Sequence, residues 1–169
     1  MAEPVIIGCF PRSGSTLLRC ILNTHPNIYA GPELGFRIKA ILEQLYGMGK
    51  KANLIEQDTK KLARLWIENF YQTACYRNNK TRWIDKSPLN LTFSSYWKDV
   101  FPNSKFIIMV RDPRDCLASF RKLGYSKVLN AFWPGAGFDD DEYKMFLFIL
   151  QLFEELKKEI ESTLEIYGQ

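Results

Sequence analysis

Small, hydroxyl-bearing and basic residues follow a short apolar run near the start of the chain. Residues 5–9 (VIIGC) are typical of a β-strand, and residues 15–23 have the apolar spacing of a helix. Between and across these two elements lie Arg12, Ser13, Gly14, Ser15 and Thr16. Backbone N–H groups of such a loop and of the helix start can surround a phosphate-like anion, to which Arg12 adds a fixed positive charge and the hydroxyls add donors. The alternative is a Gly/Ser turn that caps an ordinary helix.

This loop resembles a Walker A loop but differs from it in two respects. Five residues instead of four separate Gly8 from Gly14, and Ser15 stands where the Walker lysine would be. Both differences weaken an interpretation as an ATPase or kinase.

A second group of possible anion ligands follows residues 105–110 (KFIIMV), which we interpret as a buried strand of a parallel sheet. Arg111 ends this strand, and Asp112 and Pro113 are a typical N-cap and first residue of a helix. Ser119 lies eight residues after Arg111, which is about two helical turns into that helix. Arg111 and Ser119 could therefore form a two-donor anion site. The alternative is that Arg111 and Arg114 pair with the nearby carboxylates Asp112 and Asp115.

The remaining pattern alternates strands with helices. Helices are predicted at 36–46 and 55–77, separated by Gly47–Gly49, and near 89–101; a strand is predicted at 83–85, a loop at 124–138 and an acidic amphipathic helix from about Asp140 onward. This alternation predicts an α/β fold with a parallel sheet, expected as a single domain over residues 1–169. Ligands bind such sheets beyond the carboxyl ends of the strands. Both candidate anion sites fall at that edge.

The distribution of charge along the chain is consistent with an anionic ligand. Other features of the sequence argue against a metal site, a membrane span and a nucleic-acid-binding module. Residues 1–130 carry 20 basic and 10 acidic side chains, whereas residues 131–169 carry 3 and 9. The four cysteines form no CxxC pair and the chain has one histidine, so we expect no metal site. No signal peptide or membrane span is predicted, which makes a cytoplasmic location the expectation. The lysines are scattered and match no nucleic-acid-binding module, so nucleic acid is not an expected partner. A membrane is not an expected partner either, since no membrane span is predicted.

Two segments together resemble the sulfotransferases that use 3′-phosphoadenosine 5′-phosphosulfate (PAPS), in particular the branch of tyrosylprotein sulfotransferases and their bacterial relatives. They are Phe10–Leu18 (FPRSGSTLL) and Phe101–Asp115 (FPNSKFIIMVRDPRD), followed by Ser119, and the resemblance covers roughly residues 4–123. It implies a P-loop-type, three-layer α/β domain. It also implies that the loop Arg12–Thr16 wraps the 5′-phosphosulfate of PAPS and that Arg111 and Ser119 hold the 3′-phosphate, without a metal.

The same resemblance implies roles for three residues in catalysis. Gly31–Glu33 is similar to a Gly-x-Glu segment of the family, which makes Glu33 the expected general base. Lys86, in the segment Trp83–Pro88, is similar to a family lysine that stabilises the departing nucleotide, and Arg12 would share that role. The alternatives are a solvated loop carboxylate for Glu33 and, for Lys86, a surface lysine paired with Asp85 or Asp99.

These observations predict a sulfotransferase that moves the sulfuryl group of PAPS to a hydroxyl-bearing acceptor by in-line displacement. The alternatives are a non-catalytic or fragmentary domain that binds PAPS or its product, and a P-loop nucleotide phosphotransferase. Domains of the family are usually longer, with a further strand and a closing segment, so we expect that the carboxyl-terminal part is absent here. The sequence leaves open the oligomeric state and whether the acceptor is a protein tyrosine, a glycan, a lipid or a small molecule.

Overall fold

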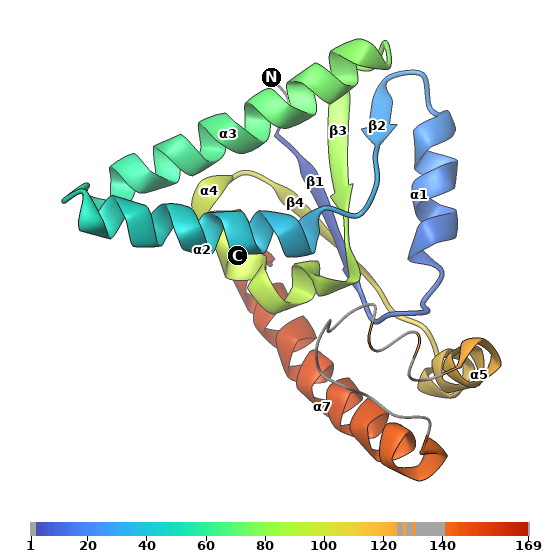
Figure 1. Ribbon diagram of the computed structural model, residues 1–169. Coiled ribbons are helices and arrows are strands. Elements are labelled where there is room, and N and C mark those ends of the chain that lie inside the picture. Colours follow the sequence, from blue (N-terminus) through green and yellow to red (C-terminus); the bar gives the residue numbers. More distant parts are fainter. Residues whose placement is uncertain (1–2, 125–126, 128–129, 131–140, 169) are drawn as a thin grey trace.

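Four parallel strands form the centre of the protein (Figure 1). The computed structural model describes residues 3–124, 127, 130 and 141–168. The strands are β1 (Val5–Cys9), β2 (Ile28–Ala30), β3 (Arg82–Lys86) and β4 (Lys105–Met109), in the spatial order β2-β3-β1-β4. All three strand pairings are parallel. The predicted α/β fold with a parallel sheet is therefore confirmed.

Helices pack against both faces of this sheet. The first part of the chain adds α1 (Ser15–Thr24), α2 (Gly35–Lys51) and α3 (Glu56–Arg77). A 3₁₀ helix, η1 (Pro88–Phe93), then precedes α4 (Ser94–Val100), α5 (Pro113–Leu123) and the long α7 (Glu142–Tyr167). Two separate apolar clusters result, one beneath α2, α3 and α4 and the other beneath α5 and α7. The helix–sheet–helix arrangement is the layered architecture expected from the sequence.

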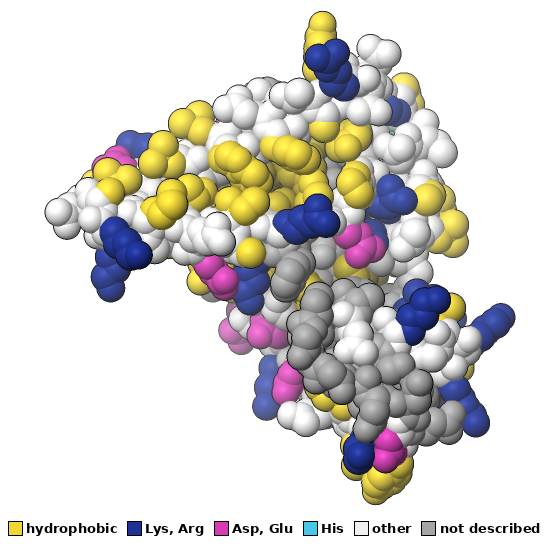
Figure 2. Space-filling model, viewed as in Figure 1, with side chains coloured by type: hydrophobic (Ala, Val, Ile, Leu, Met, Phe, Trp, Pro, Cys, Tyr) yellow, Lys and Arg dark blue, Asp and Glu magenta, His cyan; other side chains and the backbone are white. Residues whose placement is uncertain are grey.

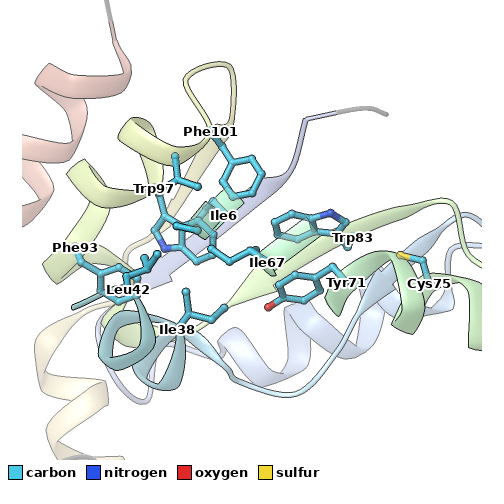
Figure 3. Packing of buried hydrophobic residues seen from close by; sticks show 12 residues of the cluster. Ile6, Ile38, Leu42, Ile67, Tyr71, Cys75, Trp83, Phe93, Trp97 and Phe101 are labelled. Atoms are coloured by element: carbon cyan, nitrogen blue, oxygen red, sulfur yellow. The ribbon is translucent and has the colours of Figure 1, made fainter. Parts of the chain in front are cut away.

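Aromatic side chains fill the cluster beneath α2, α3 and α4 (Figure 3). Tyr71 of α3 lies parallel to Trp83 of β3, with ring centroids 4.1 Å apart. Trp97 of α4 and Phe101 are completely buried beside them. Burying such large rings provides much of the stability of this face, since each removes a large apolar area from water. This closely packed cluster therefore supports one face of the sheet.

Two predicted helix boundaries are wrong. The glycines at 47 and 49 do not separate two helices, because α2 continues through both to Lys51. A Cβ at Gly49 would lie 2.3 Å from the Thr59 hydroxyl oxygen of α3, so this glycine allows two helices to approach closely. The predicted helix near 89–101 is instead η1 followed by α4.

The strand predictions need two corrections. β2 was not predicted, because a three-residue strand has too short a pattern to be recognised. β4 lies at the edge of the sheet, with Ile107 and Val110 exposed, although its apolar run indicated a buried strand. An apolar run indicates that a strand packs against other apolar residues, but it does not indicate whether the strand lies at the edge or in the centre of the sheet. Much of the predicted loop 124–138 lies outside the described residues, and among the described helices none is long and apolar enough to cross a membrane.

Candidate functional site

A small pocket lies at the carboxyl ends of the strands. Its volume is about 180 Å³, and its walls come from the loops that follow β1, β2 and β4, from the starts of α1 and η1, and from α5. It is lined by Arg12, Gly14, Ser15, Thr16, Glu33, Pro88, Arg111 and Ser119. The structure thus brings both predicted anion sites and the predicted base into one pocket at the expected edge of the sheet.

The loop after β1 has an unusual backbone. Arg12 has φ of 71° and Gly14 has φ of 92°, so both lie in the left-handed region. Glycine enters this region freely, whereas a residue such as Arg12 does so at a cost that structures tolerate mainly at functional sites. Gly14 is the N-cap residue of α1 and contributes no side chain there, so the helix start faces the pocket with its backbone. A helix start of this kind favours an anion.

Hydrogen bonds join this loop to α5 and to the segment that precedes it, across about a hundred residues of sequence. The Nε of Arg12 donates to the Ser119 hydroxyl at 3.0 Å, and a terminal nitrogen of Arg111 donates to the Arg12 carbonyl at 3.2 Å. Two guanidinium groups and one hydroxyl therefore converge on the pocket. This arrangement suits an anion, because the guanidinium groups remain charged and have donors to spare.

Local charge pairs, the alternative for this segment, are also present. Arg111 lies 3.5 Å from Asp115, and Arg114 pairs with Asp112 at 2.6 Å. Asp112 caps α5 as predicted, accepting a bond from the backbone N–H of Arg114. Hydrogen bonds from Arg114 lower the pKa of the Asp112 carboxyl to about 2. Arg111 therefore both lines the pocket and takes part in a local pair, whereas Arg114 is fully engaged on the exposed start of the helix.

Glu33 and Lys86 form an ion pair with each other. Glu33 lies between β2 and α2 with 40% of its side chain exposed, whereas Lys86, the last residue of β3, has only 1% exposed. The alternative of a surface lysine paired with Asp85 or Asp99 does not hold, because Lys86 is buried and its ion pair is with Glu33. Asp99 lies 3.5 Å from Lys60 instead, and Asp85 accepts its hydrogen bonds from Tyr71 and Asn90. The two residues with implied catalytic roles are in direct contact.

A buried polar network begins at the residue before Lys86 and was not predicted from the sequence. Asp85 precedes Lys86 and accepts hydrogen bonds from the Tyr71 hydroxyl and from the Asn90 side chain. Asn90 also donates to the Ile7 carbonyl and accepts from the Trp97 indole at 3.1 Å. Burial raises the pKa of the Asp85 carboxyl to about 6, although the Tyr71 and Asn90 hydrogen bonds oppose this shift. The only indication of this network in the sequence was a carboxylate, Asp85, within a predicted strand.

Other candidate residues lie outside the pocket. The Ser13 hydroxyl faces the Cys116 sulfur, 4.0 Å away, and the buried Lys86 contacts Glu33 without lining the pocket itself. His25 is the C-cap residue of α1, since its backbone N–H donates to the Leu22 carbonyl. Burial raises the pKa of the Cys9 thiol to about 11, so it stays neutral. Within the described ranges, no three His, Cys, Asp or Glu side chains are grouped as metal ligands would be.

The fold and the site together define a class of α/β proteins with a parallel sheet and, after the first strand, a loop suited to an anion. Residues 4–144 match the sulfotransferase family, and the chain belongs to that family. It is 34% identical over 116 residues to a protein-tyrosine sulfotransferase of Drosophila melanogaster, covering 65% of this chain and 23% of that protein. It is 31% identical over 147 residues to protein-tyrosine sulfotransferase 1 of Homo sapiens, covering 83% of this chain and 37% of the human protein.

A solved structure confirms the fold. The sulfotransferase domain from the curacin biosynthetic pathway superimposes with a TM-score of 0.61 at 24% identity, covering 97% of this chain and 62% of that domain. The chain spans less than half of the length of the two protein-tyrosine sulfotransferases. The family resemblance inferred from the two sequence segments is confirmed, and sulfuryl transfer is the chemistry of the family.

Proposed function

We propose that this protein transfers the sulfuryl group of PAPS to a hydroxyl-bearing acceptor by in-line displacement. The observation that carries the proposal is the convergence of Arg12, Arg111 and Ser119 with Glu33 on one pocket, together with the ion pair between Glu33 and the buried Lys86. These groups supply both an anion-binding site and a base with a cation beside it. Membership of the sulfotransferase family supports the same assignment.

The lining residues fit the anionic parts of the donor. A volume of about 180 Å³ is below the usual 300–1,000 Å³ of pockets that enclose a whole ligand, so this pocket suits phosphate-sized groups. We assign the 5′-phosphosulfate to the loop Arg12–Thr16 and the start of α1. Arg111 and Ser119 hold the 3′-phosphate. Because Ser119 now accepts a bond from Arg12, the donor's phosphates must take over some of these hydrogen bonds.

Glu33 acts as the general base. Its carboxylate takes the proton of the acceptor hydroxyl as that oxygen bonds to sulfur, and the bond between sulfur and the bridging phosphate oxygen breaks. Negative charge then develops on the departing phosphate, where Lys86 and Arg12 stabilise it. The Glu33–Lys86 contact keeps the base and this cation adjacent, so proton removal and charge stabilisation occur at neighbouring points. Cationic side chains supply the stabilisation that this mechanism needs.

The binding part of the proposal is tested by measuring the melting temperature of the protein as 3′-phosphoadenosine 5′-phosphate is added. A ligand that binds only the folded state must raise the melting temperature. We expect a rise with the bisphosphate that exceeds the rise with AMP or with ATP and Mg²⁺. Arg111→Met should abolish most of it, whereas the matched control Arg114→Met should not, because Arg114 does not line the pocket. A larger rise with ATP and Mg²⁺ would favour a phosphotransferase instead.

Turnover is tested separately with sulfur-labelled PAPS and a panel of acceptors. A tyrosine-containing peptide comes first, since the relatives are protein-tyrosine sulfotransferases, followed by a glycan and a small phenol. Transfer that is lost in Glu33→Gln while bisphosphate binding is kept supports the assignment of the base. Bisphosphate binding without transfer to any acceptor would replace the enzyme with a non-catalytic nucleotide-binding domain.

A further inference from the structure

The outer face of α3 is apolar although its inner face already packs on the core. Thr59, Ala63, Ile67, Tyr71 and Cys75 are the buried residues of this helix. On the opposite side Leu62, Leu65, Trp66, Phe70 and Tyr76 are exposed, with Leu65 54% exposed and Trp66 40% exposed. Figure 2 shows hydrophobic side chains gathered over α2 and α3 on this face. A surface helix normally carries polar residues on its outer side, and a continuous exposed apolar patch indicates a contact surface.

The two halves of this face differ in shape. Leu62 and Leu65 lie in the amino-terminal half. Near the middle of the helix the Trp66 and Phe70 rings are stacked 6.2 Å apart. From there toward the carboxyl-terminal end runs a hollow of about 510 Å³, lined by Trp66, Asn69, Phe70, Thr73, Ala74 and Arg77. Thr73 and Ala74 are small side chains, so the hollow can admit a larger one. Leucine side chains at one end and a hollow at the other are the parts of a self-complementary surface.

We propose that a second copy of this chain docks on this face, with the two α3 helices antiparallel around a two-fold axis near Ile67 and Glu68. In a two-fold contact each surface meets its own counterpart, so residues equally far from the axis lie opposite each other. Leu62 then meets Thr73 of the second copy, inside the hollow, and Leu65 meets Phe70. Apolar groups thus cover each other in both halves of the contact.

Charge at the ends of α3 supports the antiparallel arrangement. Asp58 lies in the first turn and Arg77 in the last turn of the helix. Nineteen residues of helix separate them by about 28 Å, which is too far for a contact within one chain. The same two-fold axis places Asp58 opposite Arg77 of the second copy, and this pairing occurs twice. A parallel arrangement would place like charges together at both ends. The charges therefore select one direction and one register.

Sedimentation equilibrium on the intact chain, at concentrations from about 1 to 100 µM, tests the proposal. We expect a concentration-dependent dimer. Leu65→Glu should raise the dissociation constant about tenfold or more, since it places a charge in an apolar contact. The matched control Leu164→Glu changes an equally exposed leucine of α7 and should leave the constant unchanged. Circular dichroism verifies that each variant is folded.

A charge exchange tests the register. Asp58→Arg and Arg77→Asp should each weaken the dimer, because each creates two like-charge contacts, and the double variant should restore it. A monomer throughout the concentration range would overturn the proposal and leave this face to a different partner. A dimer that is insensitive to Leu65→Glu, or that the double charge exchange does not restore, would also overturn it. Neither result depends on nucleotide binding or turnover.

Discussion

Removing either member of the Glu33–Lys86 ion pair should have unequal effects on stability, because the two side chains are unequally buried. Lys86 is 1% exposed and Glu33 is 40% exposed. In Glu33→Ala the ammonium group of Lys86 stays inside the protein without its carboxylate. In Lys86→Met the charge left behind belongs to Glu33, which water can reach. The first variant therefore strands a buried charge and the second does not.

The expected magnitudes follow from this asymmetry. Breaking a buried ion pair by removing one partner costs about 3–5 kcal/mol, whereas replacing a buried charge with an apolar group of similar size is often neutral. The exposure of Glu33 weakens the pair, and the neighbouring Asp85 offers Lys86 some compensation. We therefore expect Glu33→Ala to lower the free energy of unfolding by about 2–3 kcal/mol and Lys86→Met to change it by about 1 kcal/mol or less.

Urea unfolding at neutral pH, followed by tryptophan fluorescence, measures both changes. Trp83 and Trp97 are buried in the cluster beneath α3, so their emission reports loss of the core. With a urea slope of about 2 kcal/mol per molar, the Glu33→Ala midpoint should fall by about 1 M. Glu33→Gln is the control, because its amide oxygen can still accept a hydrogen bond from Lys86 and should therefore reduce the loss of stability. A Lys86→Met variant as unstable as Glu33→Ala would show that the burial of the lysine does not govern the pair.

Three further predictions follow from the packing and the titration of other residues. Gly8→Ala should lower the unfolding free energy by about 1–3 kcal/mol in urea, because a Cβ there would lie 2.9 Å from Leu91; an unchanged midpoint would contradict this. The pKa of Asp85 is raised from 3.8 to about 6 by burial, so its contribution to stability is full below about pH 4 and is lost as the pH rises through 6. The melting temperature of the parent relative to Asp85→Asn should therefore fall between those values, and a constant difference would refute the assignment. Phe153→Ala should lower the free energy of unfolding by about 2–4 kcal/mol and weaken bisphosphate binding, since Phe153 of α7 stacks on Phe10 at the start of the anion loop, with ring centroids 3.6 Å apart. Unchanged binding would show that α7 does not contribute to the anion site.

Local pattern was sufficient for the parts of the site that are contiguous in sequence. The strand, loop and helix over residues 5–24 could be predicted because apolar periodicity and the Arg12–Thr16 composition all lie in one short window. Arg111 and Ser119 are likewise separated by a known helical spacing. Their placement at the same sheet edge followed from the parallel topology, which brings the carboxyl ends of all strands together.

Properties that depend on strand order could not be predicted in this way. The exposure of β4 arises because no described strand pairs with its outer side, and an apolar run has the same pattern at an edge and in the centre. The contact between Gly49 and Thr59 depends on the packing angle of α2 against α3. The continuation of α2 through two glycines is therefore a tertiary effect that overrides a local preference of about 1 kcal/mol for each glycine.

The burial of Lys86 shows why the site could not be predicted completely from residue types. A lysine at a strand end is usually solvated, and the alternative of a surface lysine followed from that preference. In the fold, β3 lies between β2 and β1, and η1 begins two residues after Lys86, at Pro88. Neighbours on both sides therefore remove water from its ammonium group. The loop after β2 then provides the carboxylate of Glu33, fifty-three residues earlier in the chain. Removal from water strengthens every charge interaction at that point, so the same neighbours that make Lys86 costly to bury would make it effective against charge developing in the pocket.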